Sequence, residues 1–239
     1  MQIQTINIDF PSGGELLKGV LHLPDIHKPP VVIGSHGLES SGSSPKQLDL
    51  ARRCNELGIA YFRFDHKGCG DSTGDFLKIT TLPSRCEDLL NAVDTVKKSG
   101  HTNKSICFFG SSLGGATCLL AALTADIKGM VIVASPADSK TIELPPDDFN
   151  SRYGLTPEFY KNNLNFDLTK DISVLKNVFV VHGDEDEIVT VKNADIIFNA
   201  VNEPKKKLIF KGGDHLISNL SHQKQFIDEA SAFLENLLK

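Results

Sequence analysis

The pattern of apolar and polar positions changes near residue 31. Before that point, residues 3–10 and 16–23 alternate apolar and polar side chains on either side of a Pro-Ser-Gly-Gly segment. A period of two predicts half-buried strands, and a glycine-containing segment between two such runs predicts a hairpin. The start of the chain is therefore expected to form an antiparallel pair of strands.

From residue 31 onward, short continuous apolar runs alternate with segments of helical period. Runs without polar positions are typical of strands that are buried on both faces of a parallel sheet. They lie at residues 31–33, 60–62, 106–109, 130–134, 178–181 and 208–210. The helical segments are 48–57, 86–96, 113–123, 194–201 and 226–238. This alternation predicts an α/β protein, a mostly parallel sheet of about eight strands with helices on both faces and its sites beyond the carboxyl ends of the strands.

Composition and charge exclude several classes of protein. Of the 239 residues, 40% are hydrophobic and 23% are charged, which is typical of a soluble globular chain. The net charge of −5 leaves no basic field for nucleic acid or anionic lipid. No apolar run approaches the roughly 20 residues of a membrane helix. We therefore expect no nucleic-acid and no membrane partner, while a homo-oligomer stays an open alternative.

The cysteines and histidines give no sign of a disulfide framework or a metal site. The five cysteines are odd in number and contain no C-x-x-C pair. No H-E-x-x-H or similar spacing occurs, and His182 is expected at the surface or in a loop rather than as a ligand. The first residues lack the pattern of a signal peptide. We expect a cytoplasmic protein without a metal or other cofactor.

One turn carries the residue types of a nucleophile elbow. The segment Gly110-Ser111-Ser112-Leu113-Gly114 follows an apolar run and precedes a helical one, which is the context in which G-x-S-x-G is informative. Ser112 is the central residue, and glycines two positions to either side leave room for a sharp turn. The alternative is a Gly-Ser loop without chemistry.

A serine nucleophile needs a base and an acid, which should follow it in the chain in the order acid, then histidine. The favoured base is His215, directly after the run 208–210, because His222 lies at the start of the last helix. The acid is expected in the loop after the run 178–181. This loop contains four carboxylates: Asp184, Glu185, Asp186 and Glu187.

These motifs resemble the α/β-hydrolase superfamily, in particular small esterases such as bacterial cinnamoyl and feruloyl esterases and monoacylglycerol-lipase-like enzymes. The resemblance rests on residues 35–38, 62–74, 110–115, 182–189 and 213–215. It implies an α/β-hydrolase fold, with Asp186 as the acid and Asp184 as the alternative. It also implies an oxyanion hole made by the backbone N–H groups of Leu38 and Leu113.

The segment 137–176 interrupts the strand and helix alternation and is rich in Pro, Asp and aromatic residues. We expect one domain over residues 1–239, with this segment as a small lid inserted near the nucleophile turn. Tyr153, Phe159 and Tyr160 are the expected substrate-binding residues, since small-molecule pockets are mostly apolar. The alternative is that these rings, together with Phe149 and Phe166, only pack the insertion onto the sheet.

The expected function is a cofactor-independent serine hydrolase, a carboxylesterase acting on small or medium acyl esters, aromatic ones included. It would work through an acyl-enzyme on Ser112. The same triad also suits a thioesterase, an acyltransferase or a small peptidase. A catalytically silent hydrolase fold that only binds a ligand is the alternative from another class.

Overall fold

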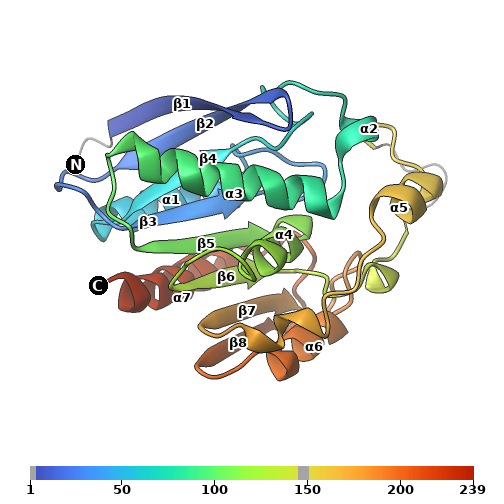
Figure 1. Cartoon of the computed structure of the whole chain (residues 1–239). Helices are drawn as coiled ribbons and strands as arrows, with labels where there is room; N and C mark the ends of the chain where they lie inside the picture. Colours follow the sequence, from blue (N-terminus) through green and yellow to red (C-terminus); the bar gives the residue numbers. More distant parts are fainter. Residues whose placement is uncertain (1–3, 145–150) are drawn as a thin grey trace.

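A computed structural model describes residues 4–144 and 151–239 of the chain. It contains one sheet with the strand order β1-β2-β4-β3-β5-β6-β7-β8 (Figure 1). The strands are β1 (Gln4–Ser12), β2 (Glu15–Leu23), β3 (Val31–Ser35), β4 (Ala60–Phe64), β5 (Ile106–Ser111), β6 (Gly129–Val133), β7 (Val178–Gly183) and β8 (Lys205–Phe210). Strand β2 is antiparallel to β1 and β4, and the remaining neighbours are parallel. The predicted mostly parallel sheet with an N-terminal antiparallel pair is confirmed.

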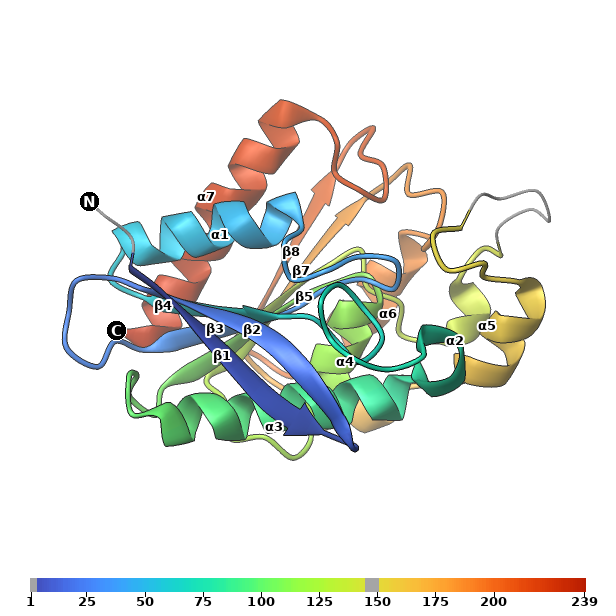
Figure 2. The same ribbon diagram turned by 90° about the horizontal axis from the view of Figure 1, so that it is seen from above.

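Helices cover both faces of this sheet (Figure 2). One face carries α1 (Pro45–Glu56) and α7 (Leu220–Leu238). The other face carries α3 (Leu82–Ser99), α4 (Leu113–Ala121) and α6 (Lys192–Ala200). Because both faces are covered, β3 and β6 are buried along their whole length, as the continuous apolar runs predict.

Two short helices, α2 (Phe76–Ile79) and α5 (Pro157–Asn163), lie to one side of these layers (Figure 2). Two 3₁₀ turns, Ser139–Thr141 and Asp171–Val174, belong to the insertion between β6 and β7. Sequence periodicity did not predict α2 or α5, because one or two turns are too short to show a helical period. Residues 145–150 of the expected lid, Phe149 among them, lie outside the described residues.

Several helices begin earlier than their apolar period indicates, because capping residues extend them. Helix α1 starts at Pro45, whose ring suits the first helical position. The Thr81 hydroxyl accepts from the Ser84 N–H at the start of α3, and the Asn219 side chain accepts from the N–H of Ser221 at the start of α7. Within the two described ranges, no helix has the length and apolar character needed to cross a lipid bilayer.

The parallel strands β3 and β5 to β8 all end at the same edge of the sheet (Figure 1). The loops that follow them contain the residues 36–44, 112, 134–144, 184–191 and 211–219. These loops bring together the side chains considered next.

Candidate active site

Ser112 lies in a strained turn between β5 and α4. Its backbone has φ 54° and ψ −125°, a conformation that non-glycine residues rarely adopt and that is typical of functional sites. The turn is held close to neighbouring strands: the Ser112 N–H donates to Val133 O at 2.8 Å. A Cβ on Gly114 would lie 2.1 Å from Ser35 O, so only glycine fits there.

Three side chains from separate loops meet at this turn. His215 Nε2 lies 3.0 Å from Ser112 Oγ, and His215 Nδ1 lies 2.8 Å from Asp186 Oδ2. An ionised carboxylate only accepts, so Nδ1 donates to Asp186 and Nε2 is left to accept from the Ser112 hydroxyl. The structure therefore brings the predicted Ser112, Asp186 and His215 together in the order that nucleophilic catalysis requires.

The Asp186 carboxylate is held by more than the candidate base. Its Oδ1 accepts from the N–H of Ile188 at 2.9 Å and of Val189 at 2.8 Å. Its Oδ2 lies 3.1 Å from His182 Nε2. Burial by itself would raise the pKa of Asp186, but the hydrogen bonds from His182 and His215 outweigh burial and hold this pKa well below its usual range. The acid is thus kept ionised.

The prediction that His182 lies at the surface or in a loop is wrong. β7 continues to Gly183, so His182 is a strand residue with no exposed surface. Its Nε2 also lies 2.8 Å from Val189 O, which makes Nε2 the protonated ring nitrogen and a donor to the carboxylate. Its position two residues before the acidic cluster gave no hint of burial.

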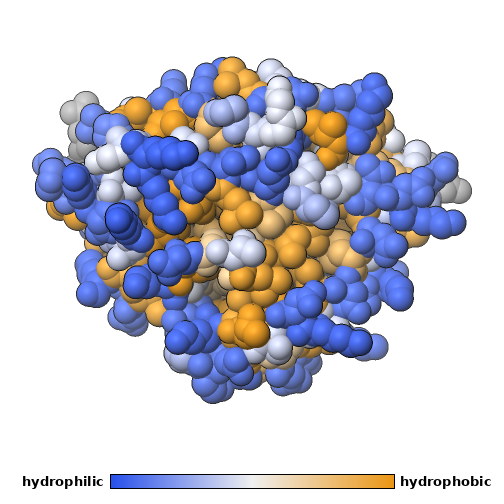
Figure 3. Space-filling view, viewed as in Figure 1, coloured by the Kyte–Doolittle hydropathy of each residue, from blue (hydrophilic) through white to orange (hydrophobic). Residues whose placement is uncertain are grey.

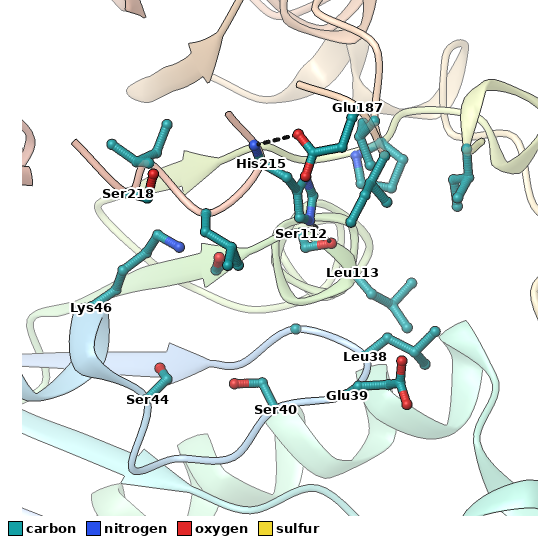
Figure 4. A pocket seen from close by; sticks show the side chains of 18 of the residues that line it. Leu38, Glu39, Ser40, Ser44, Lys46, Ser112, Leu113, Glu187, His215 and Ser218 are labelled. Carbon is teal, nitrogen blue, oxygen red and sulfur yellow. Dashed lines mark hydrogen bonds between the residues drawn. The ribbon is translucent and has the colours of Figure 1, made fainter. Parts of the chain in front are cut away.

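The other candidates from the sequence take different positions. Asp184 Oδ1 accepts from Gly212 N–H at 2.6 Å. His222 stacks on Phe210 with ring centroids 4.7 Å apart. Glu187 Oε2 accepts from the His215 N–H at 3.2 Å, the contact dashed in Figure 4. These residues fix the loops around the site and do not contact Ser112.

Leu38 and Leu113 lie beside each other next to Ser112 (Figure 4). Both line the same cavity as Ser112. A Cβ on Gly37 would lie 3.5 Å from Ser112 Cβ, which shows how closely the loop after β3 approaches the nucleophile turn. Within the described residues, neither the Leu38 nor the Leu113 N–H has an acceptor. Both amides are therefore available to a bound group.

The cavity above Ser112 has a volume of about 710 Å³. Most of its wall is apolar, and the apolar residues come from the loops, the insertion and the start of α7: Leu38, Leu113, Pro136, Ile142, Leu144, Leu164, Ile188, Val189, Leu216, Ile217, Phe226 and Ile227. None of the five cysteines lines it, so no thiol competes with Ser112 as a nucleophile there. The arrangement suits a ligand with an apolar part.

Polar side chains also reach the cavity wall, and sequence reasoning missed them. Lys46 and Ser44 come from the start of α1, and Ser218 comes from the loop before α7 (Figure 4). Glu39, next to Leu38, accepts from Ser151 Oγ at 2.5 Å and from the Tyr153 N–H, which connects this loop to the insertion. The signal available in the sequence was the Ser44-Pro45 helix start, which places the first turn of α1 at the active edge of the sheet.

The predicted substrate-binding rings differ in position. Tyr160 lines the cavity, but Tyr153 and Phe159 do not. Both pack on Phe76 of α2, with ring centroids 3.9 Å away for Tyr153 and 5.8 Å for Phe159. Helix α2, which the sequence did not reveal, thus provides an aromatic surface for these two rings, and their packing on it corresponds to the alternative given in the sequence analysis.

The surface of the protein away from the cavity is mixed in hydropathy. On the face seen in Figure 1, hydrophobic residues gather near the middle and mostly hydrophilic ones surround them (Figure 3). In residues 4–144 and 151–239, no group of three or more His, Cys, Asp or Glu side chains is arranged to hold a metal ion.

Known proteins resemble this chain in sequence or in structure. A family described as serine aminopeptidase, S33, matches residues 27–152. The uncharacterized protein YfhR of Salmonella typhi is 27% identical over 204 residues, 77% of this chain. The mitochondrial palmitoyl-protein thioesterase ABHD10 of Mus musculus is 28% identical over 212 residues, 79% of this chain.

The match spans 64% of the Salmonella protein and 69% of the mouse protein, so the chain corresponds to about two thirds of these relatives. Among solved structures, Est1E from Butyrivibrio proteoclasticus with ferulic acid bound superimposes with a TM-score of 0.81. The identity is 22%, and the alignment covers 96% of this chain and 98% of that one. This likeness shows a shared fold.

Proposed function

The chain belongs to the serine aminopeptidase S33 family of α/β-hydrolases, and from that premise we propose that it hydrolyses carboxylic esters with Ser112 as nucleophile. In this proposal His215 is the general base and Asp186 orients it. The single observation that carries the proposal is the chain of contacts from Ser112 Oγ through His215 to the Asp186 carboxylate, at 3.0 and 2.8 Å.

The reaction has two steps. As Ser112 Oγ attacks the ester carbonyl carbon, its proton moves to His215 Nε2, and the carbonyl oxygen becomes an oxyanion. The N–H groups of Leu38 and Leu113 donate to that oxyanion. When the C–O bond to the alcohol breaks, His215 returns the proton to the leaving oxygen. A water molecule, deprotonated by His215, then attacks the acyl carbon. The bond from that carbon to Ser112 Oγ breaks as His215 returns the proton to Oγ, which releases the acid and restores the Ser112 hydroxyl.

The substrate is proposed to carry a small or medium apolar acyl group. The apolar wall and the volume of about 710 Å³ support this, since such cavities bind ligands mainly through apolar contact. Tyr160 and Leu164 from the insertion contribute to the same wall. The described part of the insertion, 137–144 and 151–176, is accordingly proposed to act as a lid that selects the acyl or alcohol group.

A thioester is the second candidate substrate, because the relative ABHD10 is described as a palmitoyl-protein thioesterase. Attack on a thioester uses the same nucleophile, base and oxyanion donors, and differs only in the leaving group. Matched oxygen and sulfur esters of one acyl group separate the two candidates by their kcat/KM values.

The test of the proposed function is to label the nucleophile and to replace it. An active-site-directed fluorophosphonate should label the wild-type chain at one site. The wild-type chain should also release p-nitrophenol from p-nitrophenyl butyrate at a measurable rate. Ser112→Ala should abolish labelling and lower kcat by about 10⁴-fold or more. Ser111→Ala, one residue away, is the matched control and should keep most activity. Folded wild-type protein that is neither labelled nor active would refute the proposal.

A further inference from the structure

The loop that carries Leu38 is held from behind by a buried arginine. Arg85 lies in the first turn of α3 and is 1% exposed. Its Nη2 donates to His36 O and, at 3.3 Å, to Gly37 O. The carboxylate of Asp88, one turn further along α3, pairs with His66 and Lys67 instead. The guanidinium thus donates to two backbone carbonyls of the loop after β3, and its Nη2 also lies 3.5 Å from His36 Nδ1.

The His36 ring is a second donor to the Gly37 carbonyl. The His66 N–H donates to His36 Nε2 at 3.1 Å, so this nitrogen carries no proton. The neutral ring then has its proton on Nδ1, which donates to Gly37 O at 2.7 Å. Burial and the charge of Arg85 lower the pKa of His36, which keeps the ring in this neutral form. Gly37 O thus accepts from both His36 and Arg85.

The orientation of one peptide unit follows from these contacts. The Gly37 carbonyl and the Leu38 N–H belong to the same planar trans peptide and point in opposite directions. Two donors that hold the carbonyl toward the protein interior therefore turn the Leu38 N–H toward the cavity and Ser112. A positive charge at the carbonyl also polarises the peptide and strengthens the N–H as a donor.

We propose that Arg85 is a positioning residue of the oxyanion hole, which fixes and polarises the Gly37–Leu38 peptide so that its N–H meets the oxyanion. This inference rests on the proposed function. The cost of burying a guanidinium that has no carboxylate hydrogen-bonded to it in the described part of the chain is consistent with such a role, because a residue kept only for packing would be apolar at lower cost. Arg85 does not contact the reacting atoms.

The inference is tested with a matched pair of substrates, an aryl ester and the aryl thionoester of the same acid and phenol. Sulfur is a weaker acceptor than oxygen, so the ester depends on the oxyanion donors more than the thionoester does. In Arg85→Met, kcat for the ester should fall by about 10- to 100-fold with KM within about threefold of wild type. The ratio of kcat/KM for ester over thionoester should fall by about tenfold, because the thionoester loses less.

Leu89→Ala is the matched control, since Leu89 is a buried α3 residue without a contact to the His36 or Gly37 carbonyl. Leu89→Ala should lower the free energy of unfolding but leave the ester-to-thionoester ratio of kcat/KM unchanged. If Arg85 had only a structural role, Arg85→Met would also keep the wild-type ratio, and that result would overturn the inference. If Arg85→Met does not fold, Arg85→Lys decides. Its single ammonium centre should give an intermediate ratio, and a wild-type ratio overturns the inference.

The same assay separates this inference from the proposed function. Wild-type protein that hydrolyses neither substrate refutes both. Wild-type protein that is active, but whose substrate ratio does not respond to Arg85, refutes the role of Arg85 alone.

Discussion

Gly114→Ala should separate the nucleophile turn from the loop that carries Leu38. The new Cβ would lie 2.1 Å from Ser35 O and 2.6 Å from His36 O. Such contacts are normally at least about 3 Å, so the start of α4 and the end of β3 must move apart by about 1 Å. A displacement of that size within an active site can cost about 10²-fold in rate.

The expected result for Gly114→Ala is therefore a loss of about 100-fold in kcat/KM for p-nitrophenyl butyrate, with a loss of about 1–3 kcal/mol in the free energy of unfolding. Urea unfolding measures the second quantity. Leu119→Ala, a buried residue on the same helix, is the control: it should cost about 2–5 kcal/mol in stability but change kcat/KM by less than about threefold. Full activity in Gly114→Ala, or an equal loss of activity in Leu119→Ala, would refute the reasoning.

Three further predictions concern the acid, the buried histidines and the cavity wall. Asp186→Asn should lower kcat by about 10⁴-fold while Asp184→Asn lowers it by less than about tenfold, and the reverse order in steady-state kinetics would move the acid by two residues. His36 and His66 have pKa values well below 6.5, mainly through burial, so the unfolded chain binds protons that the folded chain does not. The contribution of these two histidines to the free energy of unfolding is therefore constant above pH 6.5 and falls below it by up to about 1.4 kcal/mol per histidine and pH unit. Urea midpoints that stay constant from pH 7 to 5.5 would contradict this. Tyr160→Ala should change the ratio of kcat/KM between butyrate and decanoate esters by about tenfold, whereas an equal change for both chain lengths would argue against contact with the acyl group.

The fold could be predicted from the sequence because its signals are local and repeated. Continuous apolar runs predicted the parallel strands, and alternation predicted β1 and β2. The positions of Ser112, Asp186 and His215 at the ends of β5, β7 and β8 follow from the same pattern, because parallel strands end at one edge of the sheet. Periodicity and order along the chain were sufficient for the fold and for the loops that carry these residues, whereas the choice of Asp186 among the four carboxylates of its loop came from the resemblance to the α/β-hydrolases.

The rest depends on contacts between residues far apart in the sequence. Whether Tyr153 or Tyr160 reaches the cavity is decided by Phe76, which the chain places more than seventy residues earlier. The burial of Arg85 depends on the carbonyls of the loop after β3, and no periodicity indicates which backbone groups a side chain will meet. These features are tertiary, and the sequence pattern does not encode them locally.

The bond between Glu39 and the insertion has a consequence for how this architecture can be altered. Glu39 directly follows Leu38, the proposed oxyanion donor, and accepts from Ser151 Oγ and the Tyr153 N–H. The insertion and the loop after β3 are therefore not separable modules. An engineer who exchanges the insertion for that of another hydrolase, in order to graft a new specificity, must also supply a partner for the Glu39 carboxylate. A graft that omits this partner would alter turnover and selectivity together.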